Sequence, residues 1–160
     1  MTSITEHLTW AEATVTQFDR DPDIRLAQDN PPAQVRANLL RIAVDLFEPA
    51  RALVGPMRVN SGYRCPKLNL LIGGSRTSAH MDGRALDLVP VRLSVTEAMK
   101  RIADSDLPYD QIIWELGRWI HLGIAEHGKE PRRQRLAMFH PSRYELFNAN
   151  DPRIRGVEAI

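Results

Sequence analysis

The sequence predicts an α+β fold in which a small antiparallel sheet is flanked by helices. Its 160 residues fit one domain. Apolar residues recur at helical spacing between residues 35 and 47, whereas the later apolar runs are only five or six residues long, as strands are. Strands and helices interleave without a regular strand–helix–strand alternation, which favours α+β over a parallel α/β sheet.

The N-terminal part, residues 1–55, is expected to be mostly helical. Thr9 and Glu12 have the spacing of a capping box, which predicts a short helix to about residue 19. The prolines of residues 21–32 predict a loop. An amphipathic helix should follow, and Pro49 should end or kink it. Its apolar face is formed by Val35, Leu39, Ile42, Val44, Leu46 and Phe47.

The central part, residues 56–126, should hold the sheet. Strands are predicted at 57–61, 84–89, 111–115 and 119–124, and helices at 65–71 and 94–105. The last two strands should pair around a turn at Gly117. The C-terminal part, residues 127–160, shows less pattern and is expected to be a basic, polar tail. A solvated surface is favoured over a patch that attracts anionic cell wall.

Composition excludes several classes of protein. The net charge is +1, which gives no strong field for nucleic acid, and no apolar run approaches the length of a membrane-spanning helix. The first residues lack the basic start and apolar stretch of a secretory signal, so synthesis in a cytoplasm is expected. Cys65 is the sole cysteine; a buried apolar role is favoured over a nucleophile. A monomer is the default expectation.

Three residues suit a zinc site. His80 and Asp87 stand seven positions apart, a spacing that fits a loop entering a strand, and His121 lies in an apolar strand where a polar side chain needs a partner. Two imidazoles and one carboxylate would leave a fourth zinc position open, which indicates catalysis. The alternative for His121 is a buried histidine bonded to a backbone carbonyl.

A zinc hydrolase also needs a general base and groups that bind substrate. Glu115, at the end of an apolar strand, is the best candidate base; the alternative is a solvent-facing carboxylate. Arg64 can hold a substrate carboxylate or stabilise an oxyanion, or can be a surface arginine. Ser78 can bond substrate or cap a loop. Tyr63, next to Arg64, is also expected to contact substrate.

Three spaced blocks carry a resemblance to a known family. They are Ser61-Gly-Tyr-Arg64-Cys-Pro-Lys-Leu-Asn69 with Gly73-Gly74, then Ser78-x-His80-x-x-Gly83-x-Ala85-x-Asp87, and Gln111-Ile-Ile-x-Glu115-x-x-x-Trp119-Ile-His121. Together they resemble the D-Ala-D-Ala carboxypeptidase-like zinc peptidases, which bacteriophages often encode as endolysins and whose fold the Hedgehog signalling domain shares.

The resemblance implies one zinc ion per chain, bound by His80, Asp87 and His121. It implies Glu115 as base and Arg64 as the substrate or transition-state arginine, although several relatives carry an acidic residue where this chain has Arg118. The implied substrate is the stem peptide of bacterial peptidoglycan. The scissile bond stays open between D-Ala-D-Ala, L-Ala-D-Glu and D-Ala–diaminopimelate.

The setting that fits is a phage endolysin, made in the host cytoplasm without a signal peptide and released through a holin pore to the periplasm and cell wall. No nucleic acid or membrane partner is expected. Two alternatives remain: a virion component that opens the wall on entry, and a zinc-binding module of the same fold without catalysis.

Overall fold

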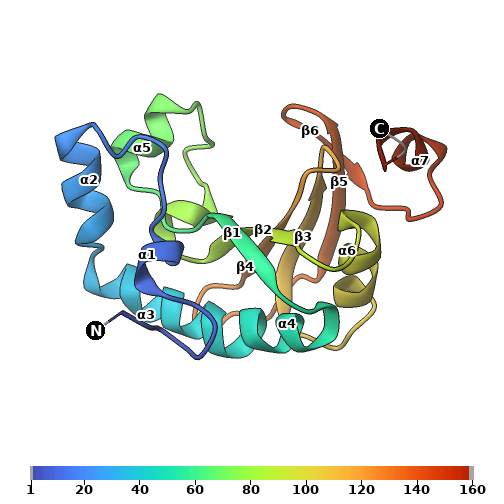
Figure 1. Ribbon diagram of the computed structural model, residues 1–160, viewed down its shortest axis with the longest axis horizontal. Helices are drawn as coiled ribbons and strands as arrows, with labels where there is room; N and C mark the ends of the chain where they lie inside the picture. Colours follow the sequence, from blue (N-terminus) through green and yellow to red (C-terminus); the bar gives the residue numbers. More distant parts are fainter. Residues whose placement is uncertain (1, 159–160) are drawn as a thin grey trace.

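The computed structural model describes residues 2–158 and confirms the predicted α+β class. Its strands form one six-stranded sheet in the order β1-β2-β4-β3-β5-β6 (Figure 1). Neighbouring strands run antiparallel except β3 and β5, which are parallel. The strands are β1 Met57–Ser61, β2 Ala85–Pro90, β3 Tyr109–Glu115, β4 Trp119–Ile124, β5 Gln134–His140 and β6 Arg143–Leu146. The helices are α1 Trp10–Ala13, α2 Pro22–Asp29, α3 Ala33–Ile42, the π-helical turn η1 Ala43–Phe47, α4 Glu48–Val54, α5 Pro66–Leu71, the 3₁₀ turn η2 Ala79–Asp82, α6 Val95–Ala103 and α7 Pro152–Glu158.

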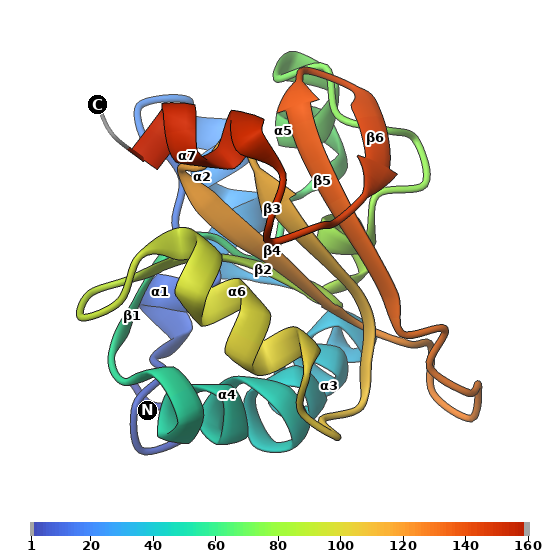
Figure 2. The ribbon, with the colours of Figure 1, turned by 90° about the vertical axis from the view of Figure 1, so that its right-hand side faces the viewer.

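The main apolar core lies between one face of the sheet and the helices α3, α4 and α6; α6 stands in front of the sheet in Figure 2. Because side chains alternate along a strand, every second residue of the central strands points into this core. These are Leu86 and Leu88 of β2, Ile112 and Trp114 of β3, and Ile120 and Leu122 of β4. The residues between them therefore face the opposite side of the sheet.

Packing in this core predicts the effect of a small deletion. Ile112 is fully buried in the main cluster. Ile112→Val removes one methylene from a close-packed site, so the free energy of unfolding should fall by about 1 kcal/mol. Urea unfolding measures the change, and Leu26→Ala, at a residue 66% exposed, serves as the control that should leave stability nearly unchanged. An equal loss in both variants would contradict the assignment of this core.

A smaller buried cluster ties the N-terminal segment to α3 and α5. It contains Ala13, Ile24, Val35, Leu39, Tyr63, Cys65 and Leu68. Cys65 is buried and unpaired, which confirms the expected apolar role.

The predicted central elements are confirmed to within two residues, whereas the N-terminal part departs from the prediction at three points. The capping box of Thr9 and Glu12 is present, but α1 ends at Ala13. The expected loop at 21–32 instead contains α2. Pro22 stands in the first turn of α2, where no backbone N–H is required, and the Asp21 carboxylate accepts hydrogen bonds from the backbone N–H groups of Asp23 and Ile24.

The helix that the sequence predicts to end or kink at Pro49 does not end there. It passes through η1, where the N–H of Glu48 bonds to the carbonyl of Ala43, five residues earlier. A π-helical turn shifts the hydrogen-bond pattern at the point where Pro49 lacks an N–H, so α4 can continue to Val54.

The C-terminal part is not an unpatterned tail. It supplies β5, which pairs in parallel with β3, then β6 at the sheet edge, and α7. Ala137 and Ile154 of this part join the main core. The short continuous apolar run Leu136-Ala-Met-Phe139 is the sequence signal for β5, and the surrounding arginines obscure it.

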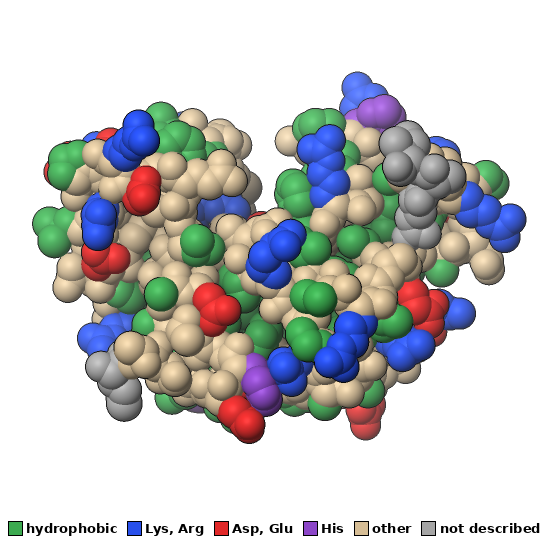
Figure 3. All heavy atoms as spheres, in the orientation of Figure 1, with side chains coloured by type: hydrophobic (Ala, Val, Ile, Leu, Met, Phe, Trp, Pro, Cys, Tyr) green, Lys and Arg blue, Asp and Glu red, His purple; other side chains and the backbone are tan. Residues whose placement is uncertain are grey.

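The surface is hollowed between the part of the molecule that carries α5 and the part that carries β6 (Figure 3). The sheet face opposite the core forms the floor of this cleft. None of the described helices is long and apolar enough to cross a membrane.

Candidate metal site and cleft

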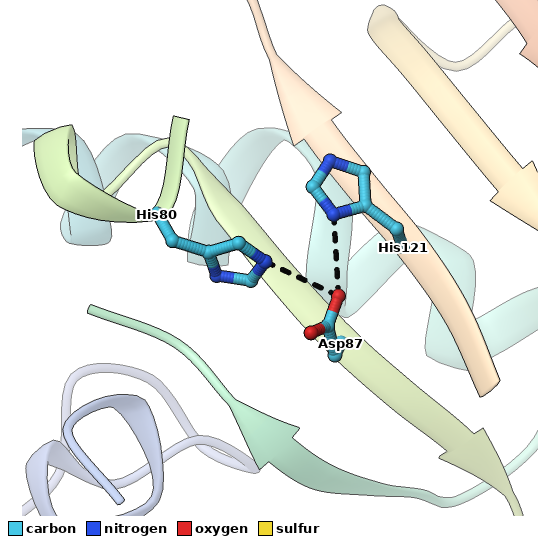
Figure 4. A group of neighbouring side chains, drawn as sticks. All are labelled: His80, Asp87 and His121. Carbon is cyan, nitrogen blue, oxygen red and sulfur yellow. Dashed lines mark hydrogen bonds and ion pairs between the residues drawn. The ribbon is translucent and has the colours of Figure 1, made fainter. Parts of the chain in front are cut away.

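Three polar side chains meet on the floor of the cleft, and they are the three that the sequence singled out. His80 comes from η2, Asp87 from β2 and His121 from β4, and both rings point toward the carboxylate (Figure 4). His80 Nε2 and His121 Nδ1 each lie 3.2 Å from Asp87 Oδ1. One ligand atom from each residue lies within 4.8 Å of the others. All three side chains are buried.

Strand register explains why Asp87 and His121 meet. They are direct partners across the antiparallel pair of β2 and β4, so their side chains project from the same face. Each is also flanked on its own strand by residues of the main core, which fixes which face it takes. The sequence pattern of an apolar strand with one polar position thus places two of the three groups.

His80 reaches the same point through a tight turn. Gly83 closes η2 with a φ of 71°, and a side chain there would put its Cβ 2.7 Å from the Val35 carbonyl oxygen. Glycine therefore lets η2 lie against α3. The Nδ1 of His80 lies 2.8 Å from the Gly62 carbonyl oxygen, which orients the ring and leaves Nε2 facing Asp87.

The donor set fits zinc. Two imidazole nitrogens and one carboxylate oxygen are common zinc ligands, and tetrahedral bonds of about 2 Å separate neighbouring ligand atoms by roughly 3.3 Å, close to the two histidine–aspartate distances of 3.2 Å. Burial by itself would raise the pKa of Asp87, but the charge of His80 and hydrogen bonds from both histidines outweigh it and hold the pKa well below its usual range. Asp87 is thus an anion ready to bind a cation.

Glu115 stands beside this group. It ends β3 directly opposite Trp119, and its Oε1 lies 3.9 Å from His121 Nδ1. Burial and the charge of Asp87 raise its pKa, while His121, Trp119 and Arg64 act in the opposite direction. Its side chain is only 14% exposed, so it is not a solvent-facing carboxylate.

Arg64 is held at the other wall of the cleft by a small network. Its Nη1 donates to Asn69 Oδ1 at 3.1 Å, and its backbone N–H donates to the His80 carbonyl at 3.0 Å. Asn69 is buried and in turn donates to the Ser75 carbonyl. The Nε of Arg64 is buried without a hydrogen-bond partner among residues 2–158. Unpaired buried donors are rare and are typical of sites that bind a ligand.

The two remaining residues that the sequence predicted to bind substrate, Ser78 and Tyr63, differ in where they lie. Ser78 lines the cleft, and its Oγ accepts the N–H of His80 at the start of η2. Tyr63 does not reach the cleft: it is 3% exposed and packs in the smaller cluster. Neighbouring residues in an extended segment point to opposite sides, so Arg64 faces the cleft and Tyr63 faces away from it.

The sequence did not identify the far wall of the cleft. This wall includes Arg132, Gln134 and Leu136 before and within β5, and Ser142 and Tyr144 in the β5–β6 hairpin. The cleft has a volume of about 820 Å³ and extends from Arg64 and the histidines to this wall. That volume lies within the range usual for ligand-binding clefts and is large enough for a short peptide segment.

Comparison with known proteins agrees with this geometry. A search of curated proteins found no significant match. The family model described as Peptidase M15 matches residues 6–123, which include His80, Asp87, Glu115 and His121. Members of that family are zinc-dependent, and the three converging side chains form a potential zinc site. The chain therefore belongs to the peptidase M15 family of D-Ala-D-Ala carboxypeptidase-like zinc peptidases.

Proposed function

We propose that this protein hydrolyses peptide bonds in the stem peptides or cross-links of bacterial peptidoglycan. The observation that carries the proposal is a three-ligand metal site with a buried carboxylate beside it, on the floor of a peptide-sized cleft. Three protein ligands leave a position for water or substrate, as in catalytic zinc sites.

His80, Asp87 and His121 would hold the zinc ion. When bound, zinc supplies a Lewis acid that polarises a carbonyl and makes a water easier to deprotonate. Glu115 takes the proton from the attacking water and returns it to the leaving amine. Its position 3.9 Å from His121 supports this role, because it reaches the space beside the metal site without being one of the three converging ligands.

Arg64 is the group that binds the developing oxyanion or a substrate carboxylate. Two of its features support this role: it lines the cleft, and its Nε lacks a partner among the described residues. A guanidinium presents several donors in one plane and suits a carboxylate or an oxyanion. Ser78 contributes by fixing the N-terminal end of η2, and so the position of His80.

Gly74→Ala should disturb Arg64 without touching the metal ligands. A Cβ at this position would lie 2.1 Å from Asn69 Oδ1 and 2.9 Å from Arg64 Nη1, so the hydrogen bond between the two side chains cannot persist as it stands. Because hydrogen bonds to charged groups are strong, we expect kcat/KM to fall about tenfold or more, with zinc content unchanged.

The matched control is Gly156→Ala, at a glycine whose added Cβ meets nothing within 4 Å. It should keep full activity. Wild-type kinetics in the Gly74→Ala protein would contradict the role given to Arg64 and its support by Asn69.

For the setting, we infer a phage endolysin that acts as a monomer after holin-mediated release from the host cytoplasm to the cell wall, without nucleic acid or membrane partners. Its support is the resemblance of the motif blocks to phage members of the family. A non-catalytic zinc-binding module of the same fold is disfavoured because Glu115 and Arg64 both line the cleft. A virion component would instead be detected in purified particles.

The test is digestion of purified Gram-negative peptidoglycan by the zinc-loaded protein, with fragments identified by mass spectrometry beside a chelated sample. Fragments that appear only without chelator would support the peptidase and identify the bond it cleaves. Intact peptidoglycan after treatment with protein that holds one zinc ion would favour the binding module.

A further inference from the structure

The wall of the cleft nearest β6 lies outside the segment that matches the family model, which ends at residue 123. Within this wall, Tyr144 lies in the middle of β6 and lines the cleft. Resting on the proposed function, we propose that Tyr144 is a substrate-binding residue, whose phenol hydrogen-bonds a backbone amide of the bound peptide and helps select peptides long enough to reach it.

Strand register places Tyr144 in line with the metal site. Trp119 pairs with Glu115, Glu115 with Met138, and Met138 with Tyr144, so these four residues form one row across the strands β4, β3, β5 and β6. Directly paired residues on neighbouring strands project from the same face. Tyr144 therefore stands on the cleft face at the same level as the proposed base.

The charges around the phenol agree with this orientation. Partial burial raises the pKa of Tyr144, and the negative charges of Glu115 and Asp87 raise it further. The side chain is placed on this side of the sheet by its pairing with Met138 and by its position in the cleft lining. Tyr144 is therefore directed into the cleft even though 55% of its surface is exposed.

The hydroxyl is available for a ligand. No group in residues 2–158 forms a hydrogen bond with the Tyr144 hydroxyl. A phenol offers one donor and can accept as well, which matches the N–H and C=O of an extended peptide. The buried tyrosine Tyr109 differs in this respect, because its hydroxyl donates to the Ala103 carbonyl at 2.7 Å.

The spacing of strands gives the length of substrate that would be needed. Two inter-strand steps separate β3 from β6, which is about 10 Å at the usual strand separation. An extended peptide advances roughly 3.3 Å per residue. A substrate that reaches Tyr144 must therefore extend about three residues beyond the strand that carries Glu115, and shorter substrates should not contact the phenol.

The experiment compares wild-type protein with Tyr144→Phe, which removes only the hydroxyl. The substrate is a soluble stem peptide that the wild-type protein cleaves, together with versions shortened by one residue at a time from each end. Leu146→Ala is the matched control, because Leu146 lies on the same face of the same strand, two residues beyond Tyr144, but is 81% exposed and is not among the residues that line the cleft. Zinc content and thermal stability are measured for every protein.

We expect Tyr144→Phe to lower kcat/KM about two- to tenfold on the full-length peptide, the usual effect of losing one hydrogen bond. The loss should vanish for peptides shortened from one end and persist for those shortened from the other. Leu146→Ala should behave as the wild type throughout.

Equal kinetics of Tyr144→Phe and wild type on every peptide would overturn the proposal while leaving the peptidase intact. An equal loss on every peptide, or a loss of zinc, would also overturn it, because the effect would then be structural. A wild-type protein that cleaves no stem peptide would overturn the proposed function, and this inference with it.

Discussion

Glu115→Gln is expected to bind zinc as the wild type does and to hydrolyse its substrate about a thousandfold more slowly. The amide has nearly the size of the carboxylate but cannot take a proton from water, and general acid–base catalysis typically contributes about 10²- to 10⁴-fold. Because Glu115 is not one of the three converging ligands, the metal site should persist. The measurements are kcat on a stem peptide and zinc content by elemental analysis.

The control for this variant is Glu126→Gln. Glu126 follows β4, is paired with Lys129 and lies outside the cleft lining. It should keep full activity. Normal turnover of Glu115→Gln would remove Glu115 from the mechanism, and loss of its zinc would make it a ligand instead of a base.

His80→Ala is expected to lose both zinc and activity. His80 supplies one of three converging donors, and its ring is held by the Gly62 carbonyl at 2.8 Å, so the alanine variant keeps only two of the three ligands. Removing a group that only orients a ligand costs about 10- to 100-fold in metal affinity, and removing the ligand itself should cost more than 100-fold. Competition with a fluorescent chelator measures the zinc affinity.

His127→Ala is the matched control, since His127 is exposed and lies after β4, away from the metal site. Its zinc affinity should equal that of the wild type. Stoichiometric zinc retained by His80→Ala at wild-type affinity would contradict the assignment of the site.

The three zinc-site residues, His80, Asp87 and His121, could be predicted from the sequence because local strand and turn patterns determine where they lie. An apolar strand with a single polar residue predicts the face of that residue, so Asp87 and His121 needed only the correct pairing of β2 with β4 to meet. Glu115 followed from the turn at Gly117, which sets Glu115 opposite Trp119. Residues adjacent in the motif were harder to place: Arg64 faces the cleft, whereas Tyr63 enters the smaller cluster.

The elements that were not predicted, α2 and β5, depend on contacts between residues far apart in the sequence. The loop expected at 21–32 becomes α2 partly because Ile24 packs in the smaller cluster, and Gln28 of α2 donates to the carbonyl of Tyr63 at 2.8 Å. Strand β5 forms by parallel pairing with β3, a long-range contact that no local pattern reveals. As a result the sequence showed the metal site but only one wall of the cleft.

Hydrolysis is expected to depend on one zinc ion held by His80, Asp87 and His121. The most direct test is a titration of metal-free protein with zinc while the rate of stem-peptide hydrolysis is recorded. The rate should rise in proportion to added zinc, level off at one equivalent per chain, and stay at background in an Asp87→Ala protein. Full hydrolysis by verified metal-free protein, or a titration of Asp87→Ala that matches the wild type, would contradict the dependence on zinc at this site.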